Sequence, residues 1–376
     1  MSLDADGSLQ AGSLPEERVT SVDILRGFDM FWIVGGTAIV WALEDFGSNP
    51  FIAALTNQLE HRDWEGFVFE DFIFPLFVFL MGMAIVFSVG RIVQREGRLG
   101  AYRRIFKRFA IMFALGIFYN GGFTHGLDGT RIMGVLQRLA LCYLATALLF
   151  CHLTPKQMMA VCFGLLVGYW AWLSFVPVPD IGTVSFAKGM TWPNYLDNRY
   201  LPLNKCEGRW DAEGLLSTLP AIGSCLLGVF AGLFLKDPGV AANKKGLCLI
   251  GAGILGICAG YLWGVQFPII KKIWTSSYVI LAGGYSCLIL GIFYQTIDVW
   301  KIRFWTTPFL WIGSNALAIY MACNIVKFDK LAGRLIGDGV YAPAGGLGSM
   351  SETVIRLGFV VLLAGFLYRK KVFIRI

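Results

Sequence analysis

The chain has 376 residues, of which 56% are hydrophobic and only 15% are charged, against roughly 25% charged residues in soluble domains. This composition and a mean hydropathy of +0.63 exclude an ordinary soluble protein and favour a polytopic membrane protein. In such a protein the net charge of +7 reports topology, so we expect no nucleic-acid partner.

Residues 1–18 are predicted to be a disordered cytoplasmic tail, and residues 19–376 a single transmembrane domain. The start of the tail is polar and lacks the basic and then apolar order of a cleaved signal peptide. Of nine cysteines only Cys206 falls in a predicted loop, which argues against a disulfide framework or a thiolate metal site. Since Walker A, HExxH and Cys/His zinc patterns are missing too, we expect no metal.

Apolar stretches of about 20 residues recur from end to end, and each is long enough to cross a bilayer. We therefore predict an all-α, polytopic integral membrane helix bundle of about ten transmembrane helices embedded in a lipid bilayer. The predicted spans are 27–46, 66–90, 105–122, 131–152, 157–177, 214–235, 246–265, 276–297, 305–326 and 352–369.

Basic residues cluster after the second, sixth and eighth predicted spans and in the C-terminal tail. With ten spans all of these clusters fall on one side, and the positive-inside rule makes that side cytoplasmic. Both termini are then predicted to be inside. The loop that contains His61, the loop 178–213 and the loop 327–351 are predicted to be outside.

The first span begins with a possible N-cap, Ser21, followed by Asp23, Arg26 and Asp29 at intervals of three residues. This spacing places the three charged side chains on one helix face near the cytoplasmic end. They form either a salt-bridged helix entrance or a site in which Arg26 binds an anionic ligand from the cytoplasm.

The polar loop before the second span contains His61 and Trp64, and the span itself contains Asp71. An acid inside a span costs roughly 2.5–3.5 kcal/mol, so such residues usually face a polar cavity or a partner. Asp71 either pairs with an arginine of another helix or belongs to a reactive site. Trp64 suits either a membrane-interface anchor or a substrate contact.

Arg131 and Arg138 lie seven residues apart at the start of the fourth span, so they share a helix face. Arg138 would lie about two turns into the membrane. Since Asp71 also falls in the outer half of the bilayer, Arg138 and Asp71 either pair or line the same polar cavity.

The longest outer loop, 178–213, mixes aromatic rings with Asn194 and Asp197. Such a mixture suits a sugar, whose faces stack on rings and whose hydroxyls need polar partners, although it also suits an interface anchor. Asp211 and Glu213 stand before the sixth span, where they either contact substrate or complement the positive end of the helix.

In this order along the chain, these stretches resemble the family of membrane-bound heparan-α-glucosaminide N-acetyltransferases and their bacterial relatives, within the transmembrane acyltransferase superfamily. The matching stretches are Ser21-Val-Asp-Ile-Leu-Arg-Gly27, His61-x-x-Trp-x-Gly66, Asp71-x-Ile-Phe-Pro-x-Phe-Val-Phe-x-Met-Gly82, Arg131-Ile-x-Gly-Val-Leu-Gln-Arg138, Asp211-x-Glu-Gly-Leu-Leu-Ser217 and Lys272-x-Trp-Thr-Ser-Ser-Tyr278.

The resemblance implies that an acetyl group passes from cytosolic acetyl-CoA to an amino sugar, glucosamine or a glucosamine-ended glycan, on the other side of the membrane. The family's active-site histidine maps onto His61 and its acid onto Asp71. The resemblance also implies a bacterial inner-membrane protein with His61 on the periplasmic side, and it suggests a homodimer.

These implications give a working hypothesis in which His61 is either a general base or an acetyl carrier and Asp71 supports it. The residues expected to bind acetyl-CoA are Arg26, Arg104, Arg108 and Arg138. The residues expected to bind the acceptor are Trp64, Arg131, Asn194, Asp197, Asp211 and Glu213.

Two features of the sequence qualify this hypothesis. Animal members of the family carry asparagines at the positions of Gly35-Gly-Thr37 and Ile270, so the acceptor contacts are expected to differ. Buried acids and arginines in a protein of about ten spans also fit the alternative hypothesis, an amino-sugar transporter without acyl transfer.

Overall fold

The computed structural model describes residues 19–45, 49–122, 124, 126, 129–336 and 346–373. Among these residues the only β-type contacts are two isolated bridges, and helices account for nearly all regular structure. The prediction of an all-α polytopic membrane protein is confirmed. The predicted tail, residues 1–18, lies outside the described residues, and the single domain stays a prediction.

Helices of very different length follow one another along the chain. In order, they are α1 (Thr20–Phe31), η1 (Trp32–Gly36), α2 (Ala38–Glu44), α3 (Pro50–Leu59), α4 (Phe69–Tyr119), α5 (Val135–His152), α6 (Pro155–Phe175), α7 (Trp192–Tyr200), α8 (Thr218–Lys236), α9 (Ala242–Gly264), α10 (Ser276–Phe293), η2 (Tyr294–Val299), α11 (Thr307–Ser314), α12 (Ala316–Val326), α13 (Phe328–Ile336) and α15 (Gly346–Arg369).

The predicted number of ten membrane spans is not settled by the helices. Within the described ranges, seven helices are long and apolar enough to cross a membrane, or nine if each bent pair is one span. The bent pairs are α1–η1 with α2, at 42°, and α11 with α12, at 82°. Helix α4 is 51 residues long and covers two predicted spans, which Gly97 separates at φ 72°. The count of ten is not confirmed.

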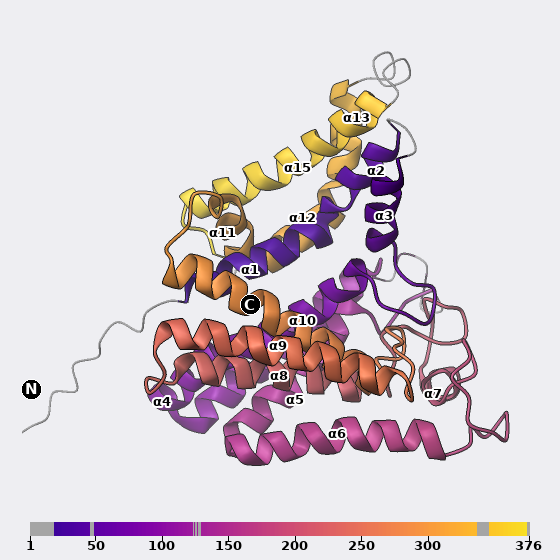
Figure 1. Cartoon of the computed structure of the whole chain (residues 1–376). Helices are drawn as coiled ribbons and strands as arrows, with labels where there is room; N and C mark the ends of the chain where they lie inside the picture. Colours follow the sequence, from indigo (N-terminus) through magenta and orange to yellow (C-terminus); the bar gives the residue numbers. More distant parts are fainter. Residues whose placement is uncertain are drawn as a thin grey trace, which may run out of the picture.

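The helices form two packed groups in Figure 1. Helices α4, α5, α6, α8, α9 and α10 pack side by side in one group, and α1, α2, α11, α12, α13 and α15 form the other. Helix α1 joins the groups because it also contacts α4, α10 and η2. The first turns of α4 therefore lie close to both groups.

Small residues allow α4 and α8 to approach closely. A Cβ atom added at Gly82 would lie 1.9 Å from the carbonyl oxygen of Cys225, and one added at Gly228 would lie 1.8 Å from that of Phe79. Such close backbone contact is the usual way in which helices associate where lipid removes the hydrophobic driving force. This contact holds the part of α4 before Gly97, which contains Asp71, against the rest of the bundle.

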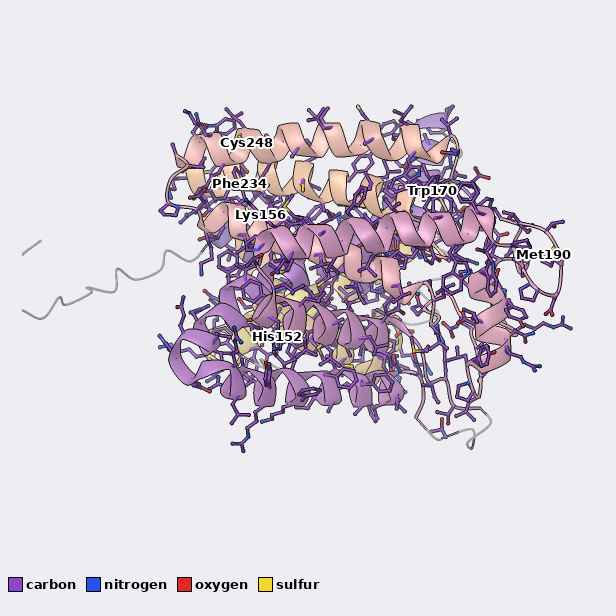
Figure 2. All side chains as sticks on the ribbon, turned by 90° about the horizontal axis from the view of Figure 1, so that it is seen from below. His152, Lys156, Trp170, Met190, Phe234 and Cys248 are labelled. Atoms are coloured by element: carbon purple, nitrogen blue, oxygen red, sulfur yellow. The ribbon has the colours of Figure 1, made fainter. Side chains whose placement is uncertain are left out.

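The loop that contains His61 lies at one end of the helix bundle, and the start of α6 lies at the other. In Figure 2, Lys156 lies at one end of α6 and the loop residue Met190 lies beyond the other end. The loop that contains His61 is at the Met190 end, because Trp64 donates a hydrogen bond to the carbonyl of Phe186 at 2.7 Å. His61 is therefore at the opposite end of the bundle from Lys156.

Candidate active site

His61, Asp71 and Lys271 meet at the start of α4. The Nδ1 atom of His61 lies 3.1 Å from Oδ1 of Asp71 and 3.0 Å from Nζ of Lys271. Lys271 also donates a hydrogen bond to Oδ1 of Asp71 at 3.2 Å. Three titratable groups from two distant parts of the sequence thus form one closed triangle.

Backbone contacts hold the two segments of this triangle together. The N–H of Gly66 donates to the carbonyl of Ile269 at 2.9 Å, and Glu65 forms an antiparallel bridge with Ile270. From α10, the hydroxyl of Tyr278 donates to the main-chain carbonyl of Asp71 at 2.7 Å. The loop before α4 and the loop before α10 are therefore fixed side by side.

The side chains of His61, Asp71 and Lys271 differ in solvent exposure, and among them His61 is the most exposed. The side chain of His61 is 57% exposed, whereas those of Asp71 and Lys271 are 0% and 20% exposed. Burial lowers the pKa of Lys271, although the negative charges of Asp71, Glu70 and Glu213 oppose that shift. Because Nδ1 faces these partners, Nε2 is the nitrogen available to a substrate.

Asp71 contacts a histidine and a lysine, and its suggested partner Arg138 bonds elsewhere. Asp71 contacts His61 and Lys271, whereas Arg138 donates to the carbonyl of Ala212 at 2.9 Å and to Oγ of Ser217 at 2.5 Å. The guanidinium of Arg138 also lies over the ring of Trp274, 4.9 Å from its centroid. The suggested Asp71–Arg138 pair is therefore absent from the described contacts.

Lys271 is the site residue that the sequence analysis missed. It directly precedes Lys272, the first residue of one matching stretch, and it lies 200 residues from Asp71. Two adjacent lysines before a span usually indicate topology and nothing more. Only the pairing of residues 65–66 with 269–270 shows that Lys271 faces His61.

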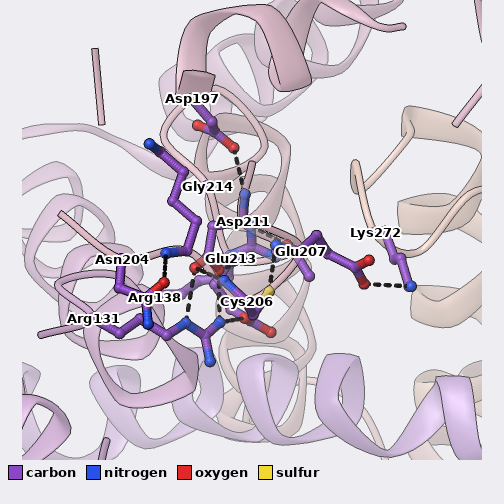
Figure 3. A network of polar contacts seen from close by, with 12 residues as sticks. Arg131, Arg138, Asp197, Asn204, Cys206, Glu207, Asp211, Glu213, Gly214 and Lys272 are labelled. Carbon is purple, nitrogen blue, oxygen red and sulfur yellow. Dashed lines mark hydrogen bonds and ion pairs between the residues drawn. The ribbon is translucent and has the colours of Figure 1, made fainter. Parts of the chain in front are cut away.

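A second cluster of charges surrounds Arg131, and Figure 3 shows it from close by. The guanidinium of Arg131 donates to both oxygens of Asp211, at 2.8 and 2.6 Å, and to Glu213 at 2.5 Å. Burial would raise the pKa of Asp211, but the hydrogen bonds and charge of Arg131 outweigh it and lower that pKa. Both acids are thus paired with Arg131.

The same cluster includes the one group of potential metal ligands found among the described residues. Ligand atoms of Cys206, Asp211 and Glu213 lie within 4.8 Å of one another. Arg131 already supplies a positive charge to both carboxylates, and burial raises the pKa of the Cys206 thiol to about 11. The guanidinium of Arg131 therefore already occupies the place of a cation beside these carboxylates.

Three predicted acceptor residues hold the outer loop together. Trp64 packs edge-to-face on Trp210 at 5.7 Å between ring centroids. Asn194 accepts from the hydroxyl of Thr191 at 2.6 Å. The buried carboxylate of Asp197 accepts from the N–H groups of Leu215 and Asp211, at 2.9 and 3.4 Å. Their assignment to the acceptor stays a prediction.

The arginines predicted to bind acetyl-CoA each have a partner within the protein. Arg26 donates to the carbonyl of Gly313 at 2.7 Å and to Asp23 at 3.0 Å, as expected for a salt-bridged helix entrance. Arg104 pairs with a glutamate of the same helix, and Arg108 lies 4.4 Å from the centroid of the Tyr143 ring. Binding of acetyl-CoA phosphates by these residues stays a prediction.

Several buried polar atoms close to Asp71 have no hydrogen-bond partner among the residues that the structure describes. They are both carboxylate oxygens of Asp29, Oε2 of Glu70 and Nε1 of Trp32. The ring of Trp32 lies 5.1 Å from that of Phe69, so these atoms come from the contact between α1 and the first turn of α4. Buried polar groups normally find a partner, so this contact fits a polar ligand or ordered water.

Comparison with known proteins identifies the family of the chain. The family model "Heparan-alpha-glucosaminide N-acetyltransferase, catalytic" matches residues 18–251. The chain belongs to this family. The match includes His61, Asp71 and the Arg131 cluster, whereas Lys271 lies beyond its end.

Curated relatives in the heparan-alpha-glucosaminide N-acetyltransferase family include the mouse and human proteins of that name. The chain is 27% identical to the mouse protein over 98% of its own length and 63% of the relative's. It is 27% identical to the human protein over 96% of its own length and 60% of the relative's. The chain thus spans about three-fifths of the length of these relatives.

Proposed function

We propose that this protein transfers the acetyl group of acetyl-CoA to the amine of an amino sugar, glucosamine or a glucosamine-ended glycan. The observation that supports this proposal most directly is the exposed imidazole of His61, which is held at Nδ1 by the buried carboxylate of Asp71. A histidine with one nitrogen anchored and the other accessible is the usual arrangement of a general base or nucleophile.

Acetyl transfer requires an amine with a free lone pair. In the direct route, Nε2 of His61 takes a proton from the amine as its nitrogen attacks the thioester carbonyl. The C–S bond breaks, an amide forms, and the CoA thiolate takes up a proton. In the two-step route, Nε2 attacks the thioester first, CoA leaves, and the amine then takes the acetyl group from the imidazole. Asp71 orients the ring in both routes.

The two substrates are proposed to bind from opposite ends of the bundle. Acetyl-CoA approaches from the cytoplasmic side towards Arg26, Arg104, Arg108 and Arg138, and the acceptor binds on the periplasmic side of a bacterial inner membrane. The position of His61 at the end away from Lys156 supports this orientation. The proposed acceptor contacts are Trp64, Arg131, Asn194, Asp197, Asp211 and Glu213.

Replacement of His61 tests the proposal. Purified His61→Ala protein receives radiolabelled acetyl-CoA and glucosamine, and the label in acetylated sugar is measured. We expect a fall of about 10²–10⁴-fold, which is the usual contribution of a positioned base. His152→Ala is the matched control, since His152 bonds Tyr102 at 2.7 Å and precedes Lys156 by four residues, at the end of the bundle away from His61. Undiminished transfer by His61→Ala would contradict the mechanism.

An amino-sugar transporter is the second candidate, and the bent helix pairs favour it. Broken spans line the substrate sites of many transporters, and Asp29 is buried on the first bent pair with both oxygens unpartnered among the described residues. Proteoliposomes with no sugar gradient separate the two candidates. Acetylated glucosamine formed there supports the transferase, whereas exchange of labelled glucosamine across the membrane without acetylation supports the transporter.

A further inference from the structure

We propose that Lys271 determines which ring nitrogen of His61 carries the proton, and thereby when the imidazole can act. This inference rests on the proposed transferase function and adds a positioning residue to it. Its basis is the triangle of short contacts in which Nζ of Lys271 and Oδ1 of Asp71 both lie within hydrogen-bond distance of the same nitrogen, Nδ1.

The two partners of Nδ1 require opposite protonation states. Asp71 is a carboxylate, so it can only accept a hydrogen bond, and Nδ1 must then carry the hydrogen. A protonated Lys271 can only donate, and Nδ1 must then offer its lone pair. A neutral imidazole carries one hydrogen. It therefore bonds either Asp71 through Nδ1–H or Lys271 through the bare Nδ1.

Only one of these two forms of His61 can take part in acetyl transfer. When Nδ1–H bonds Asp71, Nε2 has a free lone pair and can accept a proton or attack the thioester. When protonated Lys271 bonds Nδ1, the hydrogen lies on Nε2, which then has no lone pair to offer. Lys271 in its charged form thus competes with Asp71 and holds the ring in the inactive form.

Loss of the Lys271 proton releases the ring. A neutral lysine can accept from Nδ1–H, so both neighbours then favour the active form. In the direct route, Nε2 then takes the proton of the amine while Nδ1–H stays bonded to Asp71, and Nε2 gives that proton to the departing CoA thiolate. The ring thereby returns to the neutral form in which it began.

The surroundings of Lys271 make it lose its charge at a lower pH than a free lysine does. Burial lowers its pKa, and the acids that oppose this shift are Asp71, Glu70 and Glu213. An unperturbed lysine releases its proton near pH 10.4. We therefore expect transfer to rise with pH along a limb below that value, as Lys271 becomes neutral.

Two substitutions at Lys271 give opposite results if the inference is correct. Lys271→Arg keeps a permanent positive charge beside Nδ1, so transfer should fall about 10–100-fold at the pH values where Lys271 is neutral, and match the unmodified protein where Lys271 is charged; the fall is the preference that one charge-assisted hydrogen bond imposes. Lys271→Met removes the competitor. Transfer should then stay within about tenfold of the unmodified protein and should lose the rise with pH that the loss of the Lys271 proton causes.

A purely structural lysine would reverse that order. If Lys271 only neutralised Asp71, arginine would preserve activity and methionine would abolish it, and this result would overturn the inference. Full activity of both variants would overturn it as well. Where both variants are inactive, ¹⁵N NMR of histidine-labelled protein decides, with the His61 signals assigned by their loss in His61→Gln.

The NMR experiment also separates this inference from the proposed function. In the unmodified protein near neutral pH, we expect the hydrogen of His61 on Nε2, and in Lys271→Met we expect it on Nδ1. The same ring nitrogen protonated in both proteins would refute the role of Lys271. A protein with the expected NMR change but no acetyl transfer to any amine would instead refute the transferase function.

Discussion

Two clusters of buried charge in this molecule are built from similar parts and differ in one respect. In the cluster of Arg131, a fully buried carboxylate, Asp211, meets a guanidinium in a two-point contact, and Glu213 completes the pairing. In the cluster of His61, a fully buried carboxylate, Asp71, meets an imidazole and an amine. The first cluster has a fixed charge, whereas the second can gain or lose protons.

The difference lies in the chemistry of the cations. A guanidinium stays protonated at all working pH values and offers a planar fork that matches a carboxylate. Histidine and lysine both titrate, and burial brings the pKa of Lys271 down from its ordinary value. An aspartate beside Arg131 is therefore expected to stabilise structure, whereas the aspartate beside His61 is proposed to control protonation.

Replacing the acid of each cluster is the strongest test of this comparison. Asp71→Asn removes the partner that selects the active form of His61, so kcat should fall by about 10²–10⁴-fold. Asp211→Asn should instead lower the free energy of unfolding by about 1.5–3 kcal/mol, because it weakens a charge-assisted pair. It should raise KM for the acceptor more than it lowers kcat.

Both variants are compared by acetyl transfer per folded molecule and by the midpoint of thermal unfolding in detergent. Equal losses of kcat in Asp71→Asn and Asp211→Asn would show that the two clusters act as one site. The distinction between a fixed and a titratable cluster would then be wrong.

Replacing Arg131, whose charge is permanent, by lysine, whose charge can be lost, is a milder test. Arg131→Lys keeps the charge but loses the two-point contact with Asp211, and a single ammonium cannot bond both Asp211 and Glu213 in the same geometry. We expect a loss of about 1–2 kcal/mol in unfolding free energy. Arg131→Met, which removes the charge, should be less stable than Arg131→Lys. Equal unfolding free energies of the two variants would show that the positive charge at position 131 does not contribute to stability.

Much of this arrangement could be predicted from the sequence, because the strongest signals are local. Long apolar stretches predicted the membrane helices, and the cost of an acid within one of them singled out Asp71. The number of spans was harder to predict. Hydropathy separated the two parts of α4 that meet at Gly97, but it does not detect where a helix bends, as α11 and α12 do.

The partners of the charged residues could not be predicted in the same way. The sequence placed Arg138 and Asp71 at similar depth, but depth does not define which helix faces which. Lys271 reaches His61 because residues 65–66 pair with 269–270, a contact between loops that leaves no periodic pattern. Asp211 and Glu213 were identified at the start of the sixth predicted span, but their pairing with Arg131 again depends on tertiary packing.

Asp197 provides the most specific test of the cluster around Arg131, since it accepts hydrogen bonds from the main chain of Asp211 and Leu215. Gly214 permits this contact, because a Cβ atom there would lie 1.8 Å from Oδ2 of Asp197. Burial raises the pKa of Asp197 to about 6 in the folded protein, against about 3.9 in an unfolded chain.

Between about pH 4 and 6, roughly the window between these two values, the folded state retains a proton that the unfolded state has lost. Stability should therefore fall as pH rises through this window, by about 2–3 kcal/mol in total, and stay level above it. The Asp197→Asn variant has no titratable group at this position. Its unfolding midpoint in detergent should therefore not decrease between about pH 4 and 6, even if the variant is less stable at every pH. Parallel curves for the two proteins would mean that Asp197 is ionised in the folded state across this range. Its bonds to the two N–H groups would then outweigh its burial.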